Sequence, residues 1–571
     1  MIKTKFYLVL YPLLIFVSLA LGFSFKAKKA ENILKPNIIF ILTDDHRADA
    51  LGYAGNKYAF TPEMDKLAKG GTYFKNALVT TPICAASRAS ILSSMHERSH
   101  RYTFQTGDIK QEYMENAYPK ILKNAGYFTG FYGKFGVNYK KLDELFDVHE
   151  DFDRNGKYPD ERGYFFKTIG TDTVHLTRYT GQKAIEFIEN APIDKPFCLS
   201  LSFSAPHAHD NAPDQYFYDE QTSHWLENQK IEPPLLGEDK FFMAQPKEVK
   251  NGFSRLRWTW RFDQPAKYQQ MVKGYYRMIA GVDLEITKIR AELKKKGLEK
   301  NTVIIIMGDN GYFLGERQLA DKWLLYDKSI RVPLIIFDPR NKVHQDINEM
   351  ALNIDIPATI LHMAQIKRPN LYQGKSLVPL IDKQISHLRR DTVLIEHLWE
   401  FENIPPSEGV RTKDWKYFRY VNDKSWEELY NLKTDPLEIY NLSKSPKYRF
   451  VLNRLKKQTA NLINKFQDPF LGGCTDLKTK FDKSFKFSWD ISKKTKSQTS
   501  YQLLVSSSKS KIDQNIGDIW NSLQIKSASS NVNLPENITL KKGQTIFWKV
   551  RIWDELNRTG EYSESQTVIT Y

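Results

Sequence analysis

The sequence predicts an α/β protein with a separate all-β domain at its carboxyl end. From Asn37 to about Ile395, short apolar runs rich in Ile, Val and Phe alternate with stretches of helical periodicity. The hydrophobicity of these runs is continuous rather than alternating, which is typical of strands covered on both faces, as in a parallel sheet. From about Cys474 to Tyr571, alternating runs between Ser- and Lys-rich turns indicate a β-sandwich instead.

Five strands and one long helix are predicted in the α/β part. The strands are Ile38–Leu42, Phe128–Tyr132, Phe197–Phe203, Val303–Met307 and Val332–Phe337. The helix runs from about Asp263, which can cap its amino end, to Gly297, which ends it. The preceding region, from about Asn211 to Phe262, is polar and is predicted to be irregular. Its segment Phe253–Arg261 interleaves aromatic residues with arginines, so it either contacts a sulfated sugar or packs on its own domain.

The chain is expected to have four segments. Residues 1–25 form a signal peptide or N-terminal anchor, 36–395 an α/β domain, 396–470 a smaller α+β subdomain, and 474–571 the β-sandwich. In the first segment, Lys3 and Lys5 precede the uncharged stretch Phe6–Phe25, which is typical of a secretory signal. We expect this signal to be cleaved and the protein to be exported to the periplasm, the cell surface or the medium. No later segment has an apolar run long enough to span a membrane.

The composition limits the class of protein and of partner. The chain has 83 Lys and Arg residues against 67 Asp and Glu, a net charge of +16. Its 41% hydrophobic residues are enough for large cores, which excludes a disordered chain, collagen and a coiled coil. Three cysteines in 571 residues cannot form a disulfide framework, so a cysteine in a suggestive setting points to chemistry. The positive charge favours an anionic partner, which by charge alone is a nucleic acid, a membrane surface or an acidic polysaccharide.

Acidic residues follow two of the predicted strands. Asp44 and Asp45 come after the first strand, and Asp309 and Asn310 come after the strand Val303–Met307. Ligands gather at the carboxyl ends of the strands in an open parallel sheet, so these two pairs can converge. Carboxylate and amide oxygens suit a hard divalent cation such as Ca²⁺ or Mg²⁺. Acidic residues at strand ends also serve as helix caps and turn formers, so either pair alone leaves that alternative open.

Cys84 lies where a helix is predicted to begin, within the segment from Thr81 to Leu92. The N-terminus of a helix offers free backbone N–H groups to an anion. Arg88, one turn further on, points to the same side and can bind that anion with two hydrogen bonds. Cys198 lies inside a predicted strand and is expected to be a small buried hydrophobic residue.

In their order and spacing, these motifs resemble those of the type I, formylglycine-dependent sulfatases of the alkaline phosphatase superfamily. The resemblance covers about residues 36–445, and it rests on many short matches taken together. They are Asn37–Asp45 with Asp49 and Gly52, Thr61–Leu67, Cys84–Arg88, Gly133-Lys134, Ala205–His207, Gly308–Gly311, Lys322, Arg331–Leu334, Glu428–Pro436 and Asn441-Leu442. The resemblance implies a mixed sheet between helices, a smaller α+β subdomain and the hydrolysis of sulfate esters.

The resemblance also implies a modified residue and a metal ion. A separate formylglycine-generating enzyme, a partner during maturation, would oxidise Cys84 to formylglycine. One hydroxyl of the hydrated aldehyde would attack sulfur, and the other would then expel sulfate. One Ca²⁺ would be held by the family's ligand positions, which here are Asp44, Asp45, the modified Cys84, Asp309 and Asn310.

Four further side chains receive roles from the same resemblance. Arg88, Lys134 and Lys322 would stabilise negative charge on the oxygens of the transferring sulfuryl group. His207 would lie near the leaving oxygen, as general acid or sulfate ligand.

One position departs from the family pattern. A histidine usually follows Gly-Lys-x and assists release of the sulfate, but Gly136 occupies that position here. Either His46, His209 or His149 supplies the missing function, or turnover relies on the metal ion and the lysines alone.

The carboxyl-terminal segment is similar to the fibronectin-III-like domain that opens bacterial α-L-rhamnosidases. The similarity rests on Phe487–Trp489, Gln498–Ser507, Gly517–Ser522 and Phe547–Asp554. This association favours a sulfated, rhamnose-containing polysaccharide such as ulvan as substrate, although the domain could equally pack on the rest of the chain and bind nothing. Candidates for sugar subsites are Arg47, His209, Arg257, Trp258, His397 and Arg411.

Two alternative functions are weighed against a carbohydrate sulfatase. A phosphoesterase of the same superfamily normally has Ser or Thr as nucleophile and two zinc ions, which this oxygen-rich ligand set does not favour. A catalytically silent glycan-binding protein would explain Gly136, but it would not need Cys84, Arg88 and Lys134 together. The net charge then fits a sulfated polysaccharide, and we expect no nucleic-acid partner. We make no prediction of the oligomeric state.

Overall fold

The computed structural model describes residues 35–570 except 104–105, 153–164, 211, 342–343, 399–402, 424, 467–473, 483, 492–496, 555–559 and 561. The predicted signal segment, residues 1–25, lies outside the described residues. Among the helices of the described part, none combines the length and the apolar character that a membrane span requires.

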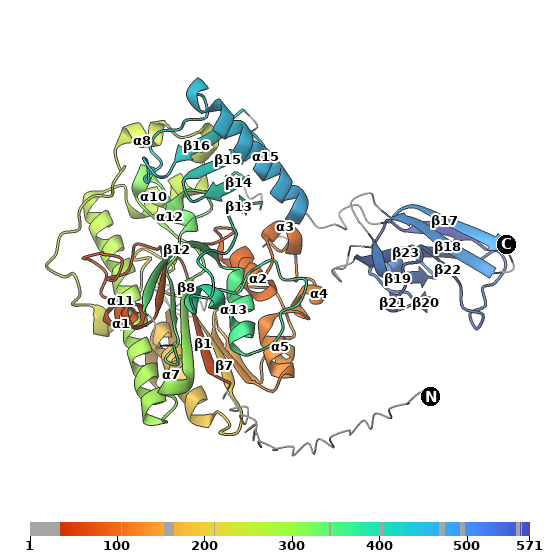
Figure 1. Cartoon of the computed structure of the whole chain (residues 1–571), viewed down its shortest axis with the longest axis horizontal. Helices are drawn as coiled ribbons and strands as arrows, with labels where there is room; N and C mark the ends of the chain where they lie inside the picture. Colours follow the sequence, from red (N-terminus) through yellow and green to blue (C-terminus); the bar gives the residue numbers. More distant parts are fainter. Residues whose placement is uncertain are drawn as a thin grey trace, which may run out of the picture. The chain divides into compact units, whose positions relative to one another are not determined.

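A mixed eight-stranded sheet is the centre of the α/β part (Figure 1). In spatial order its strands are β12 (Gln345–Leu352), β2 (Thr72–Leu78), β11 (Leu334–Phe337), β8 (Thr302–Gly308), β1 (Asn37–Thr43), β7 (Phe197–Phe203), β3 (Phe128–Gly133) and β4 (Val148–Asp151). β1 is parallel to both of its neighbours, β7 and β8. β11 is antiparallel to β8 and to β2. The mixed sheet that the family resemblance implies is therefore confirmed, and the fully parallel sheet suggested by the apolar runs is wrong. β11 is buried like the parallel strands. Its apolar sequence therefore indicates that it is buried, but not whether it runs parallel or antiparallel to its neighbours.

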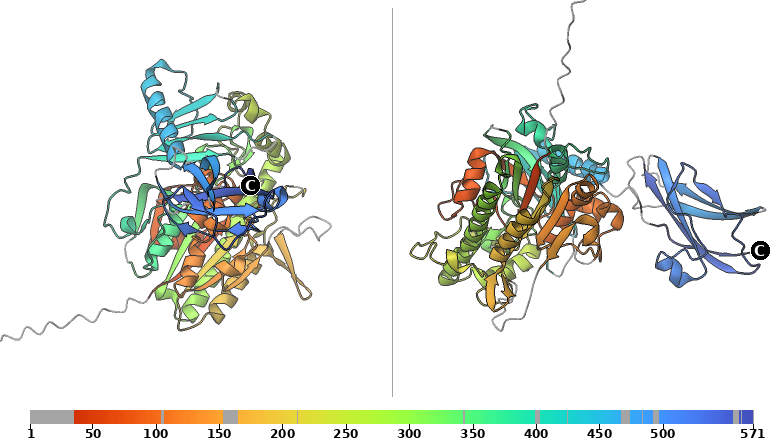
Figure 2. Two further views of the ribbon diagram at one scale, coloured as in Figure 1. Left: turned by 90° about the vertical axis from the view of Figure 1, so that its right-hand side faces the viewer. Right: turned by 90° about the horizontal axis from the view of Figure 1, so that it is seen from below.

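Helices cover both faces of this sheet (Figure 2). On one face lie α1 (Pro62–Gly70), α7 (Leu176–Asn190) and α11 (Pro265–Lys295), and Ile39 and Ile41 of β1 belong to their core. On the other lie α2 (Cys84–Ser93), α5 (Tyr118–Asn124) and α13 (Asp355–Met363), and Ile38 and Phe40 of β1 belong to that core. Both faces of β1 are thus buried, as its continuous apolar sequence predicts.

Two predictions for the region before β8 are wrong in part. The long helix exists, but α11 begins at Pro265 after Gln264, and Asp263 does not cap it. The carboxylate of Asp263 instead accepts a hydrogen bond from Lys267 at 2.6 Å. The segment predicted to be irregular contains the helix α10 (Phe253–Arg261), whose Arg255 guanidinium lies over the ring of Trp258 at 4.0 Å. Such contacts between residues three apart stabilise a helix that composition alone did not indicate.

A four-stranded antiparallel sheet follows in the chain. Its strands are β13 (Thr392–His397), β14 (Ser407–Thr412), β15 (Trp415–Tyr420) and β16 (Glu427–Asn431). Tyr417 and Leu429 of this sheet pack against Leu452 and Leu455 of α15 (Arg449–Phe466). This is the α+β arrangement expected after the α/β part.

The last part of the chain consists of two antiparallel β-sheets around a core of its own. One contains β17 (Cys474–Asp482), β18 (Ser484–Ile491) and β22 (Asn531–Asn533); the other contains β20 (Trp520–Asn521), β21 (Ile525–Lys526), β19 (Gln498–Ser506), β23 (Thr545–Asp554) and β24 (Gln566–Ile569). Phe487 and Trp489 of the first sheet pack against Tyr501 and Trp548 of the second. The predicted all-β class is confirmed for this part.

Candidate active site

The carboxyl ends of β1 and β8 bring the two acidic motifs together. The strands are parallel neighbours with Thr43 opposite Gly308, so the residues that follow them meet. Asn310 Nδ2 donates a hydrogen bond to Asp45 Oδ1 at 2.7 Å. The backbone N–H of Asp45 donates to Asp309 Oδ1 at 3.1 Å. The predicted convergence of these residues is therefore present in the fold.

Cys84 is the first residue of α2, as predicted, and it is buried with 5% of its surface exposed. Its Sγ lies 3.9 Å from Lys134 Nζ. Arg88, one turn along the helix, donates through Nε to Asp309 Oδ2 at 2.9 Å and through Nη1 to Ser202 Oγ at 2.5 Å. Burial raises the pKa of the Cys84 thiol above its ordinary value, more than the nearby lysines lower it.

Two lysines complete a ring of positive charge around the carboxylates. Lys134 Nζ donates to Asp44 Oδ2 at 2.6 Å, and Lys322 Nζ donates to Asp45 Oδ1 at 2.5 Å. Both lysines are almost fully buried. Together with Arg88, they place three cations against the carboxylates of Asp44, Asp45 and Asp309. Removing one member of such a buried cluster is strongly unfavourable, because it leaves an uncompensated buried charge.

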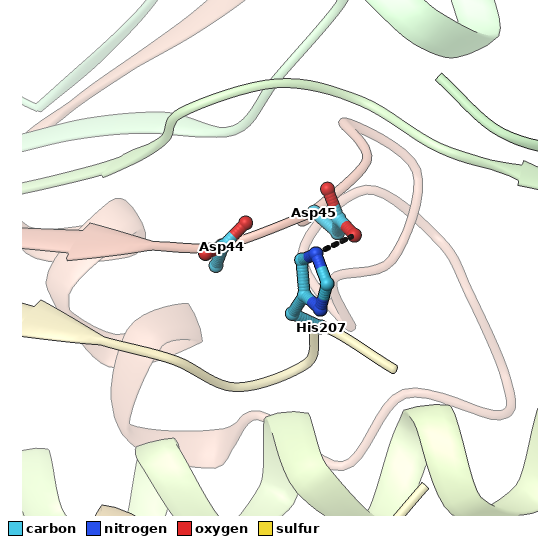
Figure 3. Close-up of side chains that lie close together, drawn as sticks. All are labelled: Asp44, Asp45 and His207. Atoms are coloured by element: carbon cyan, nitrogen blue, oxygen red, sulfur yellow. Dashed lines mark ion pairs between the residues drawn. The ribbon is translucent and has the colours of Figure 1, made fainter. Parts of the chain in front are cut away.

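His207 follows β7 and faces the same cluster (Figure 3). Its Nε2 lies 3.7 Å from Asp45 Oδ2. Its Nδ1 lies 2.6 Å from the carbonyl oxygen of Ala208. A carbonyl only accepts hydrogen bonds, so this contact assigns the Nδ1 proton and leaves Nε2 as the nitrogen directed at Asp45.

The three carboxylates have different proton affinities. Burial would raise the pKa of Asp44, but Lys134, His207, Arg88 and Lys322 together lower it well below its ordinary value. Burial raises the pKa of Asp45 to about 7; Lys322 opposes this rise, and the charge of Asp44 adds to it. Burial and the charge of Asp44 raise the pKa of Asp309 to about 6. Asp44 therefore carries its negative charge at every working pH.

The oxygens of this cluster fit a divalent cation. In the described part of the chain, Asp44 Oδ1, Asp45 Oδ2 and Asn310 Oδ1 are buried and accept no hydrogen bond. Ligand atoms of Asp44, Asp45 and His207 lie within 4.8 Å of one another. Buried oxygens without a partner are costly unless an ion or water satisfies them, and hard cations prefer such ligands. Each oxygen of Asp309 accepts one hydrogen bond, from Arg88 or from the backbone of Asp45, and has a second lone pair that can face an ion.

The raised pKa of Asp45 gives a prediction for metal affinity. Below about pH 7 the ion-free site holds a proton on this carboxyl, and an ion must displace it, so Ca²⁺ affinity should rise with pH. Titration calorimetry of ion-free protein between about pH 5 and about pH 8, in buffers of different ionisation enthalpy, should show tighter binding and less proton release at high pH. A constant affinity over this range would mean that Asp45 titrates near its ordinary value.

Gly136 occupies the position where the family has a histidine, and the fold explains why. Its φ is +69°, and a Cβ atom there would lie 2.8 Å from Arg88 Cδ. The three histidines predicted as substitutes have structural partners. The ring of His46 contacts Thr43 Oγ1 and the Ala50 carbonyl, His149 contacts Asp143 at 2.9 Å, and the ring of His209 lies edge-on to Phe217. The packing of Arg88 against Gly136 therefore takes the space that a side chain would need.

Replacing Gly136 with histidine should consequently impair the protein rather than restore a family feature. The positive φ costs about 1 kcal/mol for a residue with a Cβ, and the displaced Arg88 should lower kcat/KM by about tenfold or more. Gly170→His is the matched control, since Gly170 also has a positive φ, of +61°, but has open space around its Cβ position. Thermal denaturation and kinetics of both variants test this. A gain in activity from Gly136→His would contradict it.

Several residues predicted as sugar subsites have internal partners instead. Arg47 is buried against Asp49 and Glu316, and Arg411 is buried against Asp327. His397 is fully buried. Arg257 contacts two carboxylates, and Trp258 is covered by Arg255. Ser202, which accepts a hydrogen bond from Arg88, was not predicted; the signal for it was its position near the end of β7, on the same sheet edge as Asp44.

Comparison with known proteins identifies the fold and the family. The family described as Sulfatase matches residues 36–366, and N-sulphoglucosamine sulphohydrolase, C-terminal, matches residues 315–465. The Rha78A-like, N-terminal immunoglobulin domain matches residues 479–570. The predicted resemblance of the carboxyl-terminal part to a rhamnosidase amino-terminal domain is thus confirmed.

Individual relatives are distant but cover most of the chain. An N-acetylglucosamine-6-O-sulfatase of Bacteroides thetaiotaomicron is 27% identical over 78% of this chain and 89% of its own length. An ulvan-active sulfatase of Formosa agariphila is 26% identical over 76% of this chain and 83% of its own length. A solved structure of a protein in complex with its substrate, D-glucosamine-2-N,6-O-disulfate, has a TM-score of 0.64 at 23% identity and covers 76% of this chain and 98% of that one. Because the Sulfatase family matches more than half of the residues, this chain belongs to the sulfatase family and is a sulfuric ester hydrolase.

Proposed function

We propose that this chain hydrolyses sulfate esters of a sulfated polysaccharide or of its oligosaccharides. The observation that carries the proposal is the position of Cys84 at the start of α2, among the buried cations and carboxylates of the cluster. The relatives named N-acetylglucosamine-6-O-sulfatase and ulvan-active sulfatase support a carbohydrate substrate. The net charge of +16 is favourable for a polyanionic substrate.

Sulfated rhamnose in ulvan is the substrate that we propose first. Two independent similarities support it. One relative is named an ulvan-active sulfatase, and the carboxyl-terminal part matches a domain named after a Rha78A-like protein.

Two groups would supply chemistry that the unmodified side chains lack. Formylglycine, formed from Cys84 by a maturating enzyme, supplies a hydroxyl nucleophile in place of a thiol. A divalent cation, which we propose to be Ca²⁺, would be held by Asp44, Asp45, Asp309 and Asn310 and supplies Lewis-acid stabilisation of negative charge.

The chain's own residues then bind the sulfate ester and stabilise its charge. Arg88, Lys134 and Lys322 donate N–H groups to the carboxylates of the cluster and can also hold sulfuryl oxygens there, in a region from which water is largely excluded. His207 Nε2 is directed at the same centre, and in the imidazolium form, which carries a proton on both ring nitrogens, it can pass its proton to the leaving sugar oxygen. Buried donors of this kind act strongly, because they need no reorganisation when charge develops.

The test uses the full chain, produced together with a maturating enzyme. The mass of the tryptic peptide that contains Cys84 should match formylglycine rather than cysteine. Sulfate release should then be highest on ulvan oligosaccharides that carry rhamnose 3-sulfate, compared with carrageenan fragments, glycosaminoglycan fragments and a phosphate monoester. An unmodified thiol in protein from the native host would contradict the mechanism. Release from carrageenan or glycosaminoglycan fragments alone would overturn the choice of ulvan.

A further inference from the structure

Two arginines of α10 join the loop that carries His207 to the loop that carries Lys322. Arg261 Nη1 donates to Asp321 Oδ2 at 2.8 Å, and its Nη2 contacts Asp210. Arg257 Nη1 donates to Asp321 Oδ2 at 3.0 Å and also contacts Asp210. Asp210 lies three positions after His207, and Asp321 directly precedes Lys322. The two guanidinium groups thus bridge two segments that both face the active site.

The guanidinium of Arg261 is fully buried, and each of its nitrogens has an acceptor. Nε donates to Gln215 Oε1 at 2.6 Å, and Nη1 also donates to the hydroxyl of Tyr312 at 2.9 Å. Burial opposes the charge of Arg261, but the surrounding acceptors raise its pKa well above the ordinary value. Its position is therefore fixed by directional bonds rather than by loose packing.

Lys322 lies between two carboxylates and is closer to the one in the active site. Its Nζ is 2.5 Å from Asp45 Oδ1, in the active site, but 3.8 Å from Asp321 Oδ1. The other oxygen of Asp321 accepts from both arginines. A buried carboxylate without these partners would be strongly unfavourable, and Lys322 would be its nearest remaining cation.

The backbone around Lys322 also needs support. Asp321 and Trp323 have φ values of +71° and +75°, in the left-handed region that residues with a side chain rarely adopt. Such residues remain there only when surrounding contacts hold them. The side chain of Asp321 is one of these contacts, because the two arginines anchor it to α10.

We propose that Arg257 and Arg261 form a clamp that satisfies Asp321 and so keeps Lys322 directed at Asp45 and the sulfate ester. Both arginines are positioning residues and do not touch the reacting atoms. The clamp rests on the proposed sulfatase activity, since it serves the two segments that carry Lys322 and His207. It also gives the predicted aromatic and arginine segment a role within the protein rather than on the sugar.

Arg261→Met should lower kcat by about 100-fold with a much smaller change in KM, because Lys322 would turn toward Asp321. The discriminating variant is the double substitution Arg261→Met with Asp321→Asn. In Arg261→Met the carboxylate of Asp321 keeps only Arg257 of the two arginines. Removing its charge frees Lys322, so kcat should recover by about tenfold or more relative to Arg261→Met alone. A purely structural role predicts no such recovery in folded protein at equal concentration. Kinetics on the preferred oligosaccharide, with circular dichroism and thermal denaturation, measure these effects.

Arg390→Met is the matched control, because Arg390 forms a similarly buried pair with Asp355 at 2.5 Å outside this cluster. It should lower the melting temperature and leave kcat unchanged.

If Arg261→Met does not fold, Arg257→Gln, at a side chain 13% exposed, should give a smaller loss of kcat in the same direction. Wild-type kcat in folded Arg261→Met or Arg257→Gln, no recovery in the double variant, or an equal loss in Arg390→Met would each overturn the clamp. A wild-type protein that releases no sulfate from any ester would overturn the proposed function instead.

Discussion

Replacing Cys84 with alanine is expected to abolish sulfate release, with a loss of about 10⁵-fold or more in kcat. In the proposed mechanism this position supplies the nucleophile, and the groups around it are cations and carboxylates that bind or orient but do not attack. Lys134, 3.9 Å from Sγ, is an ammonium held by Asp44 and has no lone pair to offer. The variant should fold, because only a sulfur atom is lost from the first turn of α2. Sulfate release, circular dichroism and thermal denaturation of the variant measure both expectations.

Cys198→Ala is the matched control for this experiment. Cys198 is also a buried free cysteine, but it lies within β7 and belongs to the core beneath the sheet. Its replacement should leave a small cavity and lower stability slightly, and kcat should stay near that of the wild type. Comparable activity losses in the two variants would show that cysteine packing, rather than nucleophile chemistry, accounts for the effect.

The fold could be predicted where the burial of a strand on both faces produces a continuous apolar run in the sequence. β1, β7 and β8 appear in the sequence as apolar runs within one residue of their observed bounds, because both faces of the central strands are covered. Strand direction leaves no such trace, so the antiparallel β11 has the same pattern as its parallel neighbours. α10 was missed because its stability comes from contacts between side chains, such as Arg255 with Trp258, and not from an apolar stripe.

Some residues of the site could likewise be predicted from the sequence, and others could not. Asp44, Asp45, Asp309 and Asn310 could be found because the ends of parallel strands meet at one edge of a sheet. The clamp of Arg257 and Arg261 could not, because no periodicity brings α10 to Asp210 and Asp321. Gly136 belongs to both cases. Its departure from the family pattern is visible in the sequence, but the packing of Arg88 that accounts for it is visible only in the fold.

Asp44→Asn is expected to reduce kcat/KM by about 10³-fold and to weaken divalent-ion binding. The substitution keeps the size of the side chain but removes the one carboxylate of the cluster whose pKa lies well below its ordinary value. In the wild type, Lys134 donates to the Asp44 carboxylate at 2.6 Å. The amide of the variant would place either an N–H donor or a neutral oxygen against this lysine. Titration calorimetry with Ca²⁺ and kinetics measure the two losses. Chelation of the wild type should give a similar fall in activity, reversed by added Ca²⁺.

Asp283→Asn separates the loss of a buried charge from the loss of this particular one. Asp283 is as buried as Asp44, but burial raises its pKa to about 7, and its carboxylate accepts hydrogen bonds from the backbone at the start of α1. An amide oxygen can accept the same bonds, so activity and Ca²⁺ affinity should be unchanged. If Asp44→Asn were equally silent, the oxygen of Asp44 that accepts no hydrogen bond would not be a metal ligand, and the cations of the cluster would have to bind the sulfate ester unaided. If only Asp44→Asn loses both properties, the buried cluster binds the ion and the substrate as one unit.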